Sequence, residues 1–389
     1  MYAPWSFRDD YVILRAAATL TATGRHMAAS KDVIWPRDPH TAAKHALLRR
    51  YLQAWAPIML SHNEIITYAE GFAGPGIYTG EEPGSPVVAH HVLAGALRRF
   101  PRRVKMVLVE EDPRRKTELE RRIAAAAGTT QQTGRLDVHI TQGQCHPDLL
   151  QQLARARSLQ HPMFVLLDGF GGPVVPFHLL QRIANQRRSE VMVTFQPSFL
   201  VRFAEKNEHH RAAGDSFFGD RGWHGVFREP SSRKAAYLRD RYREALGRAG
   251  FQHTLVFEMI DEASHLLYLI FGTRHERGVE KMKEAMWVVD STSGVRYRDP
   301  KDPNQQALDL ELEPDTGPLR RILLDHLRTN PIPHTVDQLK NYTLLETVYR
   351  PTQVIPLLKR MRDERDIDVS PGRIIGTSTV ATLHQSALF

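Results

Sequence analysis

A glycine-rich stretch at residues 68–86 constrains the fold more than any other feature of this sequence. An apolar run leads into Glu70, a helical pattern begins near its end, and between them stand three glycines, at Gly71, Gly74 and Gly76. Glycine is needed where the backbone takes positive φ or lies close to a ligand. The first strand-to-helix turn of a doubly wound sheet is where nucleotides bind. The stretch therefore predicts the nucleotide-binding turn of an α/β sheet, with a purely structural glycine loop as the alternative.

Further apolar runs continue the strand and helix alternation of a parallel sheet. They lie at residues 64–69, 104–110, 136–141, 163–168 and 190–195, and helical patterns separate them. Near-continuous apolar runs are typical of parallel strands that are buried on both faces. Two more runs, at residues 254–259 and 266–271, form a hairpin pattern. The series predicts five parallel strands that end in an antiparallel hairpin.

Polar residues stand at the ends of these strands, at the edge where such sheets bind ligands. Glu110 ends the second strand, where nucleotide binders hold ribose hydroxyls, although the two acids after it could simply cap the next helix. Gln144 follows the third strand and either hydrogen-bonds an adenine or lies in a solvent-facing turn. Asp168 ends the fourth strand, where a carboxylate can orient an acceptor or take its proton, and His178 is a second candidate for that work.

The overall charge and the single cysteine limit the partners and the kind of site. A net charge of +8 favours polyanionic partners, although the same arginines would suit an ordinary solvated face. One cysteine, Cys145, excludes an intrachain disulfide and a multi-cysteine metal or iron–sulfur site, so no metal is expected. It also makes a reducing cytoplasm the default location. No apolar run approaches the roughly 20 residues that span a bilayer, so no membrane is expected.

Changes in composition divide the chain into four parts. Residues 1–32 form an extension, residues 33–298 the sheet domain, residues 299–317 a proline-rich linker and residues 318–389 a second domain. Three short amphipathic helices and a hairpin in the last part predict a winged helix, which would contact either nucleic acid or protein. Within the sheet domain, residues 209–223 are polar, glycine-rich and bulky by turns, which predicts a substrate-side loop or lid.

These motifs resemble the three-Cys-motif partner protein family, whose members are similar to S-adenosylmethionine (SAM) methyltransferases. The shared motifs lie at residues 39–45, 71–76, 83–86, 167–171, 175–177 and 271–287. The resemblance implies a Rossmann-like class I methyltransferase sheet, a nucleic acid or nucleotide as acceptor, and a separate partner protein with three cysteines. The family usually has Asp-Pro-Phe-Gly at the fourth strand. Here Gly169 follows Asp168, which makes the acceptor loop more pliable and weakens the carry-over of amino-methylation chemistry.

The glycine stretch also resembles the first motif of SAM methyltransferases, in its Phe-x-Gly-x-Gly form. SAM is then the expected cofactor, with these expected contacts: Glu70, Gly71, Phe72, Ala73, Gly74, Gly76, Glu110, Gln144, Lys44 and His40. Lys44 and His40 precede the first strand and would reach the cofactor carboxylate, although such residues more often lie on a helix surface. Asp168 and His178 are the candidate catalytic residues. The alternative is a catalytically inactive SAM-fold scaffold that recruits a partner to nucleic acid through the winged helix.

Overall fold

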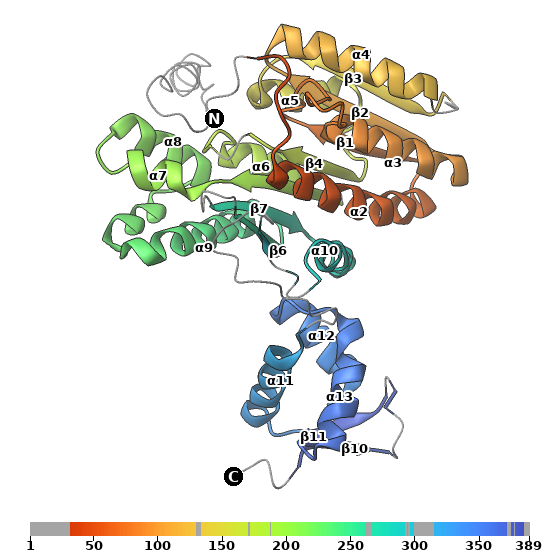
Figure 1. Cartoon of the computed structure of the whole chain (residues 1–389), viewed down its shortest axis with the longest axis vertical. Helices are drawn as coiled ribbons and strands as arrows, with labels where there is room; N and C mark the ends of the chain where they lie inside the picture. The colour runs from red at the N-terminus through yellow and green to blue at the C-terminus, as the bar shows by residue number, and fades with distance from the viewer. Residues whose placement is uncertain are drawn as a thin grey trace, which may run out of the picture. The chain divides into compact units, whose positions relative to one another are not determined.

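The predicted apolar runs form a mixed sheet in the computed structural model of the chain (Figure 1). Its strands are β1 (Ile65–Glu70), β2 (Arg103–Glu110), β3 (Leu136–Gln142), β4 (Met163–Leu167), β5 (Ser189–Phe195), β6 (His253–Ile260), β7 (Leu266–Thr273) and β8 (Arg296–Arg298). The order is β3-β2-β1-β4-β5-β7-β6, and β8 follows at the β6 edge. The first five strands pair in parallel, whereas β7 is antiparallel to both β5 and β6. This arrangement is typical of class I methyltransferases, so the predicted strand series and closing hairpin are confirmed.

The structure describes residues 32–129, 134–169, 172–186, 188–260, 266–291, 294, 296–298, 315–371, 375–376 and 378–384. The predicted extension up to residue 31 and most of the predicted linker lie outside these residues. Contacts between Cα atoms divide the chain into two units. One comprises residues 1–274 and 298–302, and the other comprises residues 275–297 and 303–389.

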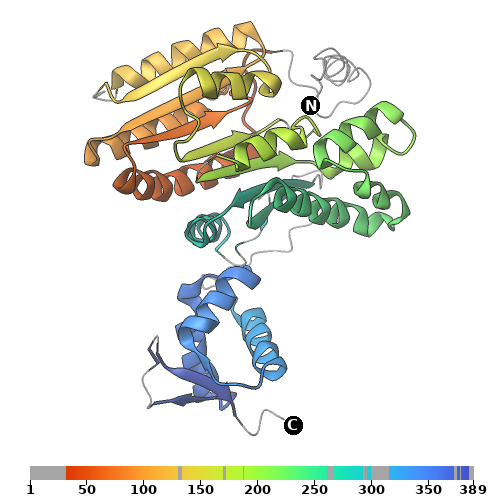
Figure 2. The same ribbon diagram turned by 180° about the vertical axis from the view of Figure 1, so that it is seen from behind.

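Helices cover both faces of the sheet in the first unit (Figures 1 and 2). They are α2 (Pro39–His62), α3 (Ser85–Arg99), α4 (Pro113–Thr129), α5 (Cys145–Arg155), α6 (Phe177–Ala184), α7 (Pro197–Phe203), α8 (Glu208–Phe218), η1 (Gly222–Arg228) and α9 (Ser231–Ala249). Helix α2 packs on α3 and α3 on α4, while α6 and α7 pack on α9. Since β4 lies at the centre of the sheet between these layers, every one of its side chains is buried.

The segment predicted as a loop or lid is instead helical. Helix α8 begins after Asn207, whose side chain accepts hydrogen bonds from the backbone N–H groups of His209 and His210, and it ends at Gly219 with φ of 77°. Its buried rings drive this outcome, because Phe217 stacks on Tyr242 of α9 with ring centroids 4.2 Å apart. The polar and glycine-rich composition had hidden that apolar stripe.

The second unit holds the predicted three helices. The sequence placed the hairpin within residues 367–375, whereas residues 367–370 pair with residues 380–383. The elements of this unit are α10 (Glu276–Val289), α11 (Gly317–Thr329), β9 (His334–Thr335), α12 (Val336–Glu346), η2 (Pro351–Gln353), α13 (Val354–Asp363), β10 (Ile367–Ser370) and β11 (Val380–Leu383). The strands form a small antiparallel sheet in the order β10-β11-β9.

Helix α10 groups with this second unit by its contacts, although the sequence placed it with the large sheet. The buried ammonium of Lys283 donates hydrogen bonds to four carbonyl oxygens around the end of α12, those of Thr343, Leu344, Thr347 and Tyr349. The indole of Trp287 donates to the carbonyl of Val348 at 3.0 Å. These bonds fix α10 to the segment that follows α12. No helix among the described residues is long and apolar enough to cross a membrane.

Candidate functional site

The glycine turn between β1 and α3 has the backbone geometry that requires glycine. Gly74 and Gly76 take φ of 64° and 75°, in the left-handed region. A Cβ on Gly76 would lie 2.9 Å from Leu119, so that glycine is also required by packing. Among the described residues, a Cβ on Gly74 would meet only the ring of Trp35, at 4.0 Å. The turn is therefore open at Gly74, where a ligand can approach the backbone.

Glu110 holds the open side of this turn from the end of β2. Its carboxylate accepts hydrogen bonds from the N–H of Gly74 at 2.8 Å and from the N–H of Asp112 at 2.9 Å. Burial raises the pKa of Glu110, although these two N–H groups act against the rise. Glu110 thus lies beside the turn, where the sequence predicted an acid. Its contact with a ribose stays a prediction.

Glu70 lies at the end of β1 and is buried. Both of its oxygens accept hydrogen bonds within the protein, from the hydroxyl of Tyr68 at 2.6 Å and from that of Ser85 at 2.7 Å. Burial raises the pKa of Glu70 to about 8. The carboxyl group therefore ties β1 to the first turn of α3 and supports the glycine turn from inside.

Close packing explains other small residues of the motif. The N–H of Ala73 donates to the carbonyl of Val109 at 3.0 Å, which fixes the turn on β2. A Cβ on Gly71 would lie 2.5 Å from the sulfur of Cys145. One on Gly169 would lie 2.5 Å from Val174 and 3.0 Å from the ring of Phe72. Phe72 thus packs against residue 169, which gives a steric reason for glycine where the resembled family has proline.

An ion pair occupies the ends of β4 and β5. The ammonium of Lys44, on α2, donates to Asp168 at 2.6 Å, and the hydroxyl of Thr194 donates to the other carboxylate oxygen at 2.8 Å. Burial by itself would raise the pKa of Asp168. The charge and hydrogen bond of Lys44, together with the Thr194 hydroxyl, outweigh burial and leave that pKa below its usual value. Asp168 is therefore a carboxylate held in place by Lys44 and Thr194. The sequence analysis expected Lys44 to reach the cofactor, and in the structure it pairs with Asp168.

Three aromatic side chains to which the sequence assigned no role, Trp35, Tyr78 and His45, connect the glycine turn to this ion pair. The rings of Tyr78 and Trp35 lie 6.0 Å apart, and those of Tyr78 and His45 lie 5.7 Å apart. Burial and the charge of Lys44 lower the pKa of His45 to about 3. Burial and the charge of Asp168 raise the pKa of Tyr78. His45 and Tyr78 are thus both neutral at physiological pH and can form hydrogen bonds without carrying charge.

The remaining predicted residues lie around the same edge of the sheet. Gln144 precedes α5, and its side-chain amide donates to Glu111 at 2.8 Å. His178, at the start of α6, has its Nε2 atom 3.1 Å from that of His146. His40 lies one turn before Lys44 on α2. Among the described residues, no three His, Cys, Asp or Glu side chains are grouped as metal ligands.

Several basic residues around β2 have structural roles. Arg135 donates to the carbonyl oxygens of Leu97 and Phe100 at the end of α3. Lys105 donates to carbonyl oxygens after α5, and Arg102 pairs with Glu64 at 2.6 Å. Arg135 and Lys105 therefore bind carbonyl groups at the ends of helices.

Comparisons with known proteins identify only distant structural similarity. No family model and no curated protein matches the sequence, the three-Cys-motif partner family included. EvdMO1 matches at 13% identity and a TM-score of 0.30, over 60% of this chain and 42% of EvdMO1. Precorrin-6y C5,15-methyltransferase from Geobacter metallireducens GS-15 matches at 10% identity and a TM-score of 0.26, over 57% of this chain and 87% of that protein. YjhP from E. coli matches at 9% identity and a TM-score of 0.21, over 59% of this chain and 98% of YjhP. The assignment of the fold rests on the strand order.

Proposed function

We propose that the protein is a SAM-dependent methyltransferase that acts on a nucleic acid or nucleotide. The observation that carries this proposal is the open backbone at Gly74 beside the carboxylate of Glu110. These groups lie at the carboxyl ends of β1 and β2, next to the point where the strand order reverses between β1 and β4. The net charge of +8 supports a polyanionic acceptor.

The residues around the turn fit the parts of SAM. The space at Gly74 would admit the methionine moiety, Glu110 would accept hydrogen bonds from the ribose hydroxyls, and Gln144 would contact the adenine. SAM supplies an activated methyl group when it is bound. Methyl transfer is an in-line displacement, so this chain contributes mainly by orienting the acceptor and excluding water.

Asp168 is proposed to position the acceptor. Lys44 keeps the pKa of Asp168 low. At neutral pH the Asp168 carboxylate therefore accepts a hydrogen bond from an N–H or O–H group without taking the proton. Proton removal would then fall to His178, which lies against His146, or to solvent. In this arrangement Lys44 is a positioning residue that acts through Asp168.

The second unit is proposed to be a winged helix that binds a protein partner. The element order α11-β9-α12-α13-β10-β11 supports that fold. On α13, Arg360 bonds to Thr316 and Arg362 bonds to Asp363, so these cations are already used within the unit. Lys359, which is exposed, is the remaining cation of α13, so the helix offers a phosphate backbone only one further positive charge. A three-cysteine protein is the partner implied by the family resemblance.

A second candidate function is a catalytically inactive SAM-fold scaffold. The observation that favours it is that both oxygens of Asp168 are already engaged, by Lys44 and Thr194. Reconstitution with a three-cysteine partner separates the two functions. If Asp168→Asn leaves transfer of a labelled methyl group unchanged, the scaffold is the better account.

Calorimetric titration with SAM and with its demethylated product tests the main proposal. We expect a Kd on the order of micromolar, and we expect Gly74→Trp to abolish binding because the indole fills the open side of the turn. Gly134→Trp is the matched control, since Gly134 has φ of 65° and no atom of the described part of the chain lies within 4 Å of its Cβ position. Absence of heat or of a thermal shift with the wild-type protein would refute the proposal.

A further inference from the structure

Helices α7 and α8 form a helical hairpin at the edge of the sheet that carries Asp168. Helix α7 begins at Pro197, directly after β5 and three residues beyond Thr194, which binds Asp168. The two helices contact each other and lie beyond the carboxyl ends of β4 and β5 (Figure 1). Helix α7 therefore begins beside the edge of the sheet that carries Asp168.

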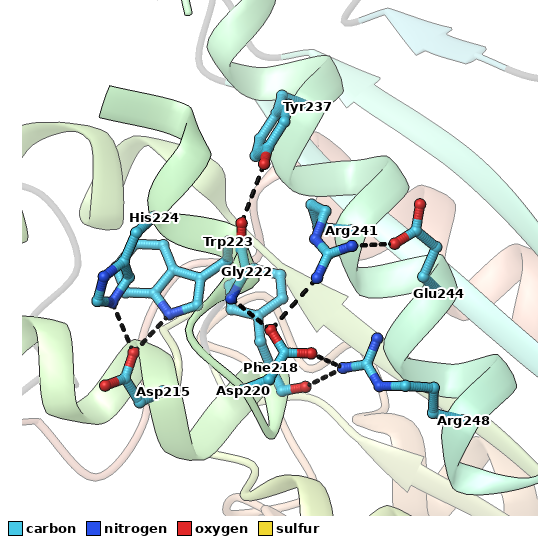
Figure 3. A network of polar contacts seen from close by, with 10 residues as sticks. All are labelled: Asp215, Phe218, Asp220, Gly222, Trp223, His224, Tyr237, Arg241, Glu244 and Arg248. Atoms are coloured by element: carbon cyan, nitrogen blue, oxygen red, sulfur yellow. Dashed lines mark hydrogen bonds and ion pairs between the residues drawn. The ribbon is translucent and has the colours of Figure 1, made fainter. Parts of the chain in front are cut away.

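A polar network fixes α8 to the segments that follow it (Figure 3). The carboxylate of Asp215 accepts a hydrogen bond from the indole of Trp223 at 2.9 Å and lies 2.7 Å from Nε2 of His224. Asp220, just after α8, pairs with Arg241 at 3.2 Å and with Arg248, both on α9. The hairpin is therefore held in place before any ligand binds.

The hairpin carries a group of aromatic rings, formed by Phe199, Phe203 and His210. Phe203 is exposed, whereas Phe199 and His210 are half-buried and Phe199 packs against the main core. Phe203 lies 5.4 Å from Phe199 and 5.8 Å from His210 between ring centroids, and Phe199 lies 5.0 Å from His210. Phe203 is 48% exposed and is the only aromatic residue among the exposed large hydrophobic side chains of the described residues. Water therefore reaches a ring that most proteins would bury.

Three cations flank these rings without a partner in the described part of the chain, namely Arg202, Lys206 and Arg211. Nε of Arg211 is buried and has no hydrogen-bond acceptor there. The arginines of α9 in the Figure 3 network are all paired, in contrast. Residues 202–211 also include Glu205 and Glu208, so this stretch has three positive and two negative side chains and a net charge of +1. Charge alone would attract a polyanion weakly, and the rings must contribute.

We propose, on the basis of the proposed function, that this surface of the α7–α8 hairpin binds the acceptor and that the acceptor is a single-stranded nucleic acid. The exposed ring of Phe203, which lies against Phe199, would stack on a base, while Arg202, Lys206 and Arg211 would bind the neighbouring phosphates. A duplex keeps the faces of its bases stacked inside and offers nothing to an exposed phenylalanine. Single strands present both groups at once, next to the edge that holds Asp168.

Fluorescence anisotropy with a short labelled single strand and with its duplex tests the proposal. We expect preference for the single strand, and we expect Phe203→Ala to weaken its binding by about tenfold. Ile332→Ala is the matched control, because Ile332 is also an exposed apolar residue, in the second unit. Phe203 is largely exposed, so the variant should fold, and its melting temperature verifies this.

A charge variant gives an independent measurement. Arg202→Gln should reduce the salt dependence of binding by about one phosphate contact. Arg233→Gln, which removes an exposed cation on α9, should leave it unchanged. Equal binding by wild-type protein and Phe203→Ala, or preference for the duplex, would overturn the proposal.

Titration of the same samples with SAM separates this proposal from the proposed function. If SAM binds and the single strand does not, the acceptor surface is wrong while the methyltransferase proposal stands. If the single strand binds through Phe203 and SAM does not, the acceptor surface stands as a nucleic-acid site and the methyltransferase proposal fails.

Discussion

Replacing Lys44 by methionine should reveal how strongly the ion pair at the site is coupled. The ammonium lies 2.6 Å from Asp168, and the two side chains are 14% and 23% exposed. Removal of one partner of a fully buried pair costs about 3–5 kcal/mol, because the other charge is left buried alone. Partial exposure screens that charge, so we expect Lys44→Met to lose about 2–3 kcal/mol. That loss lowers the melting temperature by roughly 4–10 °C.

Chemical unfolding followed by tryptophan fluorescence measures the loss, and a double-mutant cycle assigns it. Asp168→Asn removes the charge that Lys44 leaves behind, so Lys44→Met should cost much less in that background. The pKa of Asp168 is lowered in the folded protein, so the pair stabilises above the unfolded carboxyl pKa of about 4 and its contribution is lost as pH falls through the folded pKa. The deficit of Lys44→Met should therefore be largest at neutral pH and fade in acid.

Two results would refute this reasoning. If Lys44→Met costs as much in the Asp168→Asn background as in the wild type, the lysine acts through packing and not through the carboxylate. If the deficit is the same at neutral and acidic pH, the charge of Asp168 does not depend on Lys44.

Two further predictions concern buried groups away from the turn. Burial raises the pKa of Glu190 to about 7, so the folded state keeps a proton that the unfolded state loses above about pH 4.5, and stability should fall by about 2–3 kcal/mol between pH 4.5 and 7. In Glu190→Gln, which can still accept a hydrogen bond from Tyr51, urea unfolding should lack that fall, and an unchanged slope would contradict the assignment. Lys283→Met should destabilise the second unit by about 2–4 kcal/mol, because four carbonyl oxygens lose their donor. Hydrogen exchange should show lost protection in α12 and none in β4; equal protection in α12 of both proteins would count against it.

The sheet could be predicted from the sequence because its signals are local. An unbroken apolar run such as that of β4 can only be stable between two layers, and the hairpin of β6 and β7 follows from two adjacent runs. Glu110 and Gly74 were found for the same reason, since a strand end and a glycine spacing are visible within a few residues. The structure adds the hydrogen bond that joins them.

The ion pair of Lys44 and Asp168, with its hydrogen bond from Thr194, could not be predicted in that way. Lys44 is 124 positions from Asp168, and only the packing of α2 against the sheet brings them together. A single lysine on an amphipathic helix normally indicates a solvent-facing position. For the same reason, the sequence did not predict that Lys283 is buried. The helical nature of α8 had one signal, the spacing of its buried residues Ala213, Gly214, Phe217 and Phe218.

Crystallisation with the demethylated product of SAM tests the central claim most directly. The account predicts density for the ligand at Gly74, with the ribose hydroxyls within hydrogen-bond distance of the carboxylate of Glu110. Wild-type crystals in which the ligand lies elsewhere, or in which Glu110 contacts no part of it, would contradict the account.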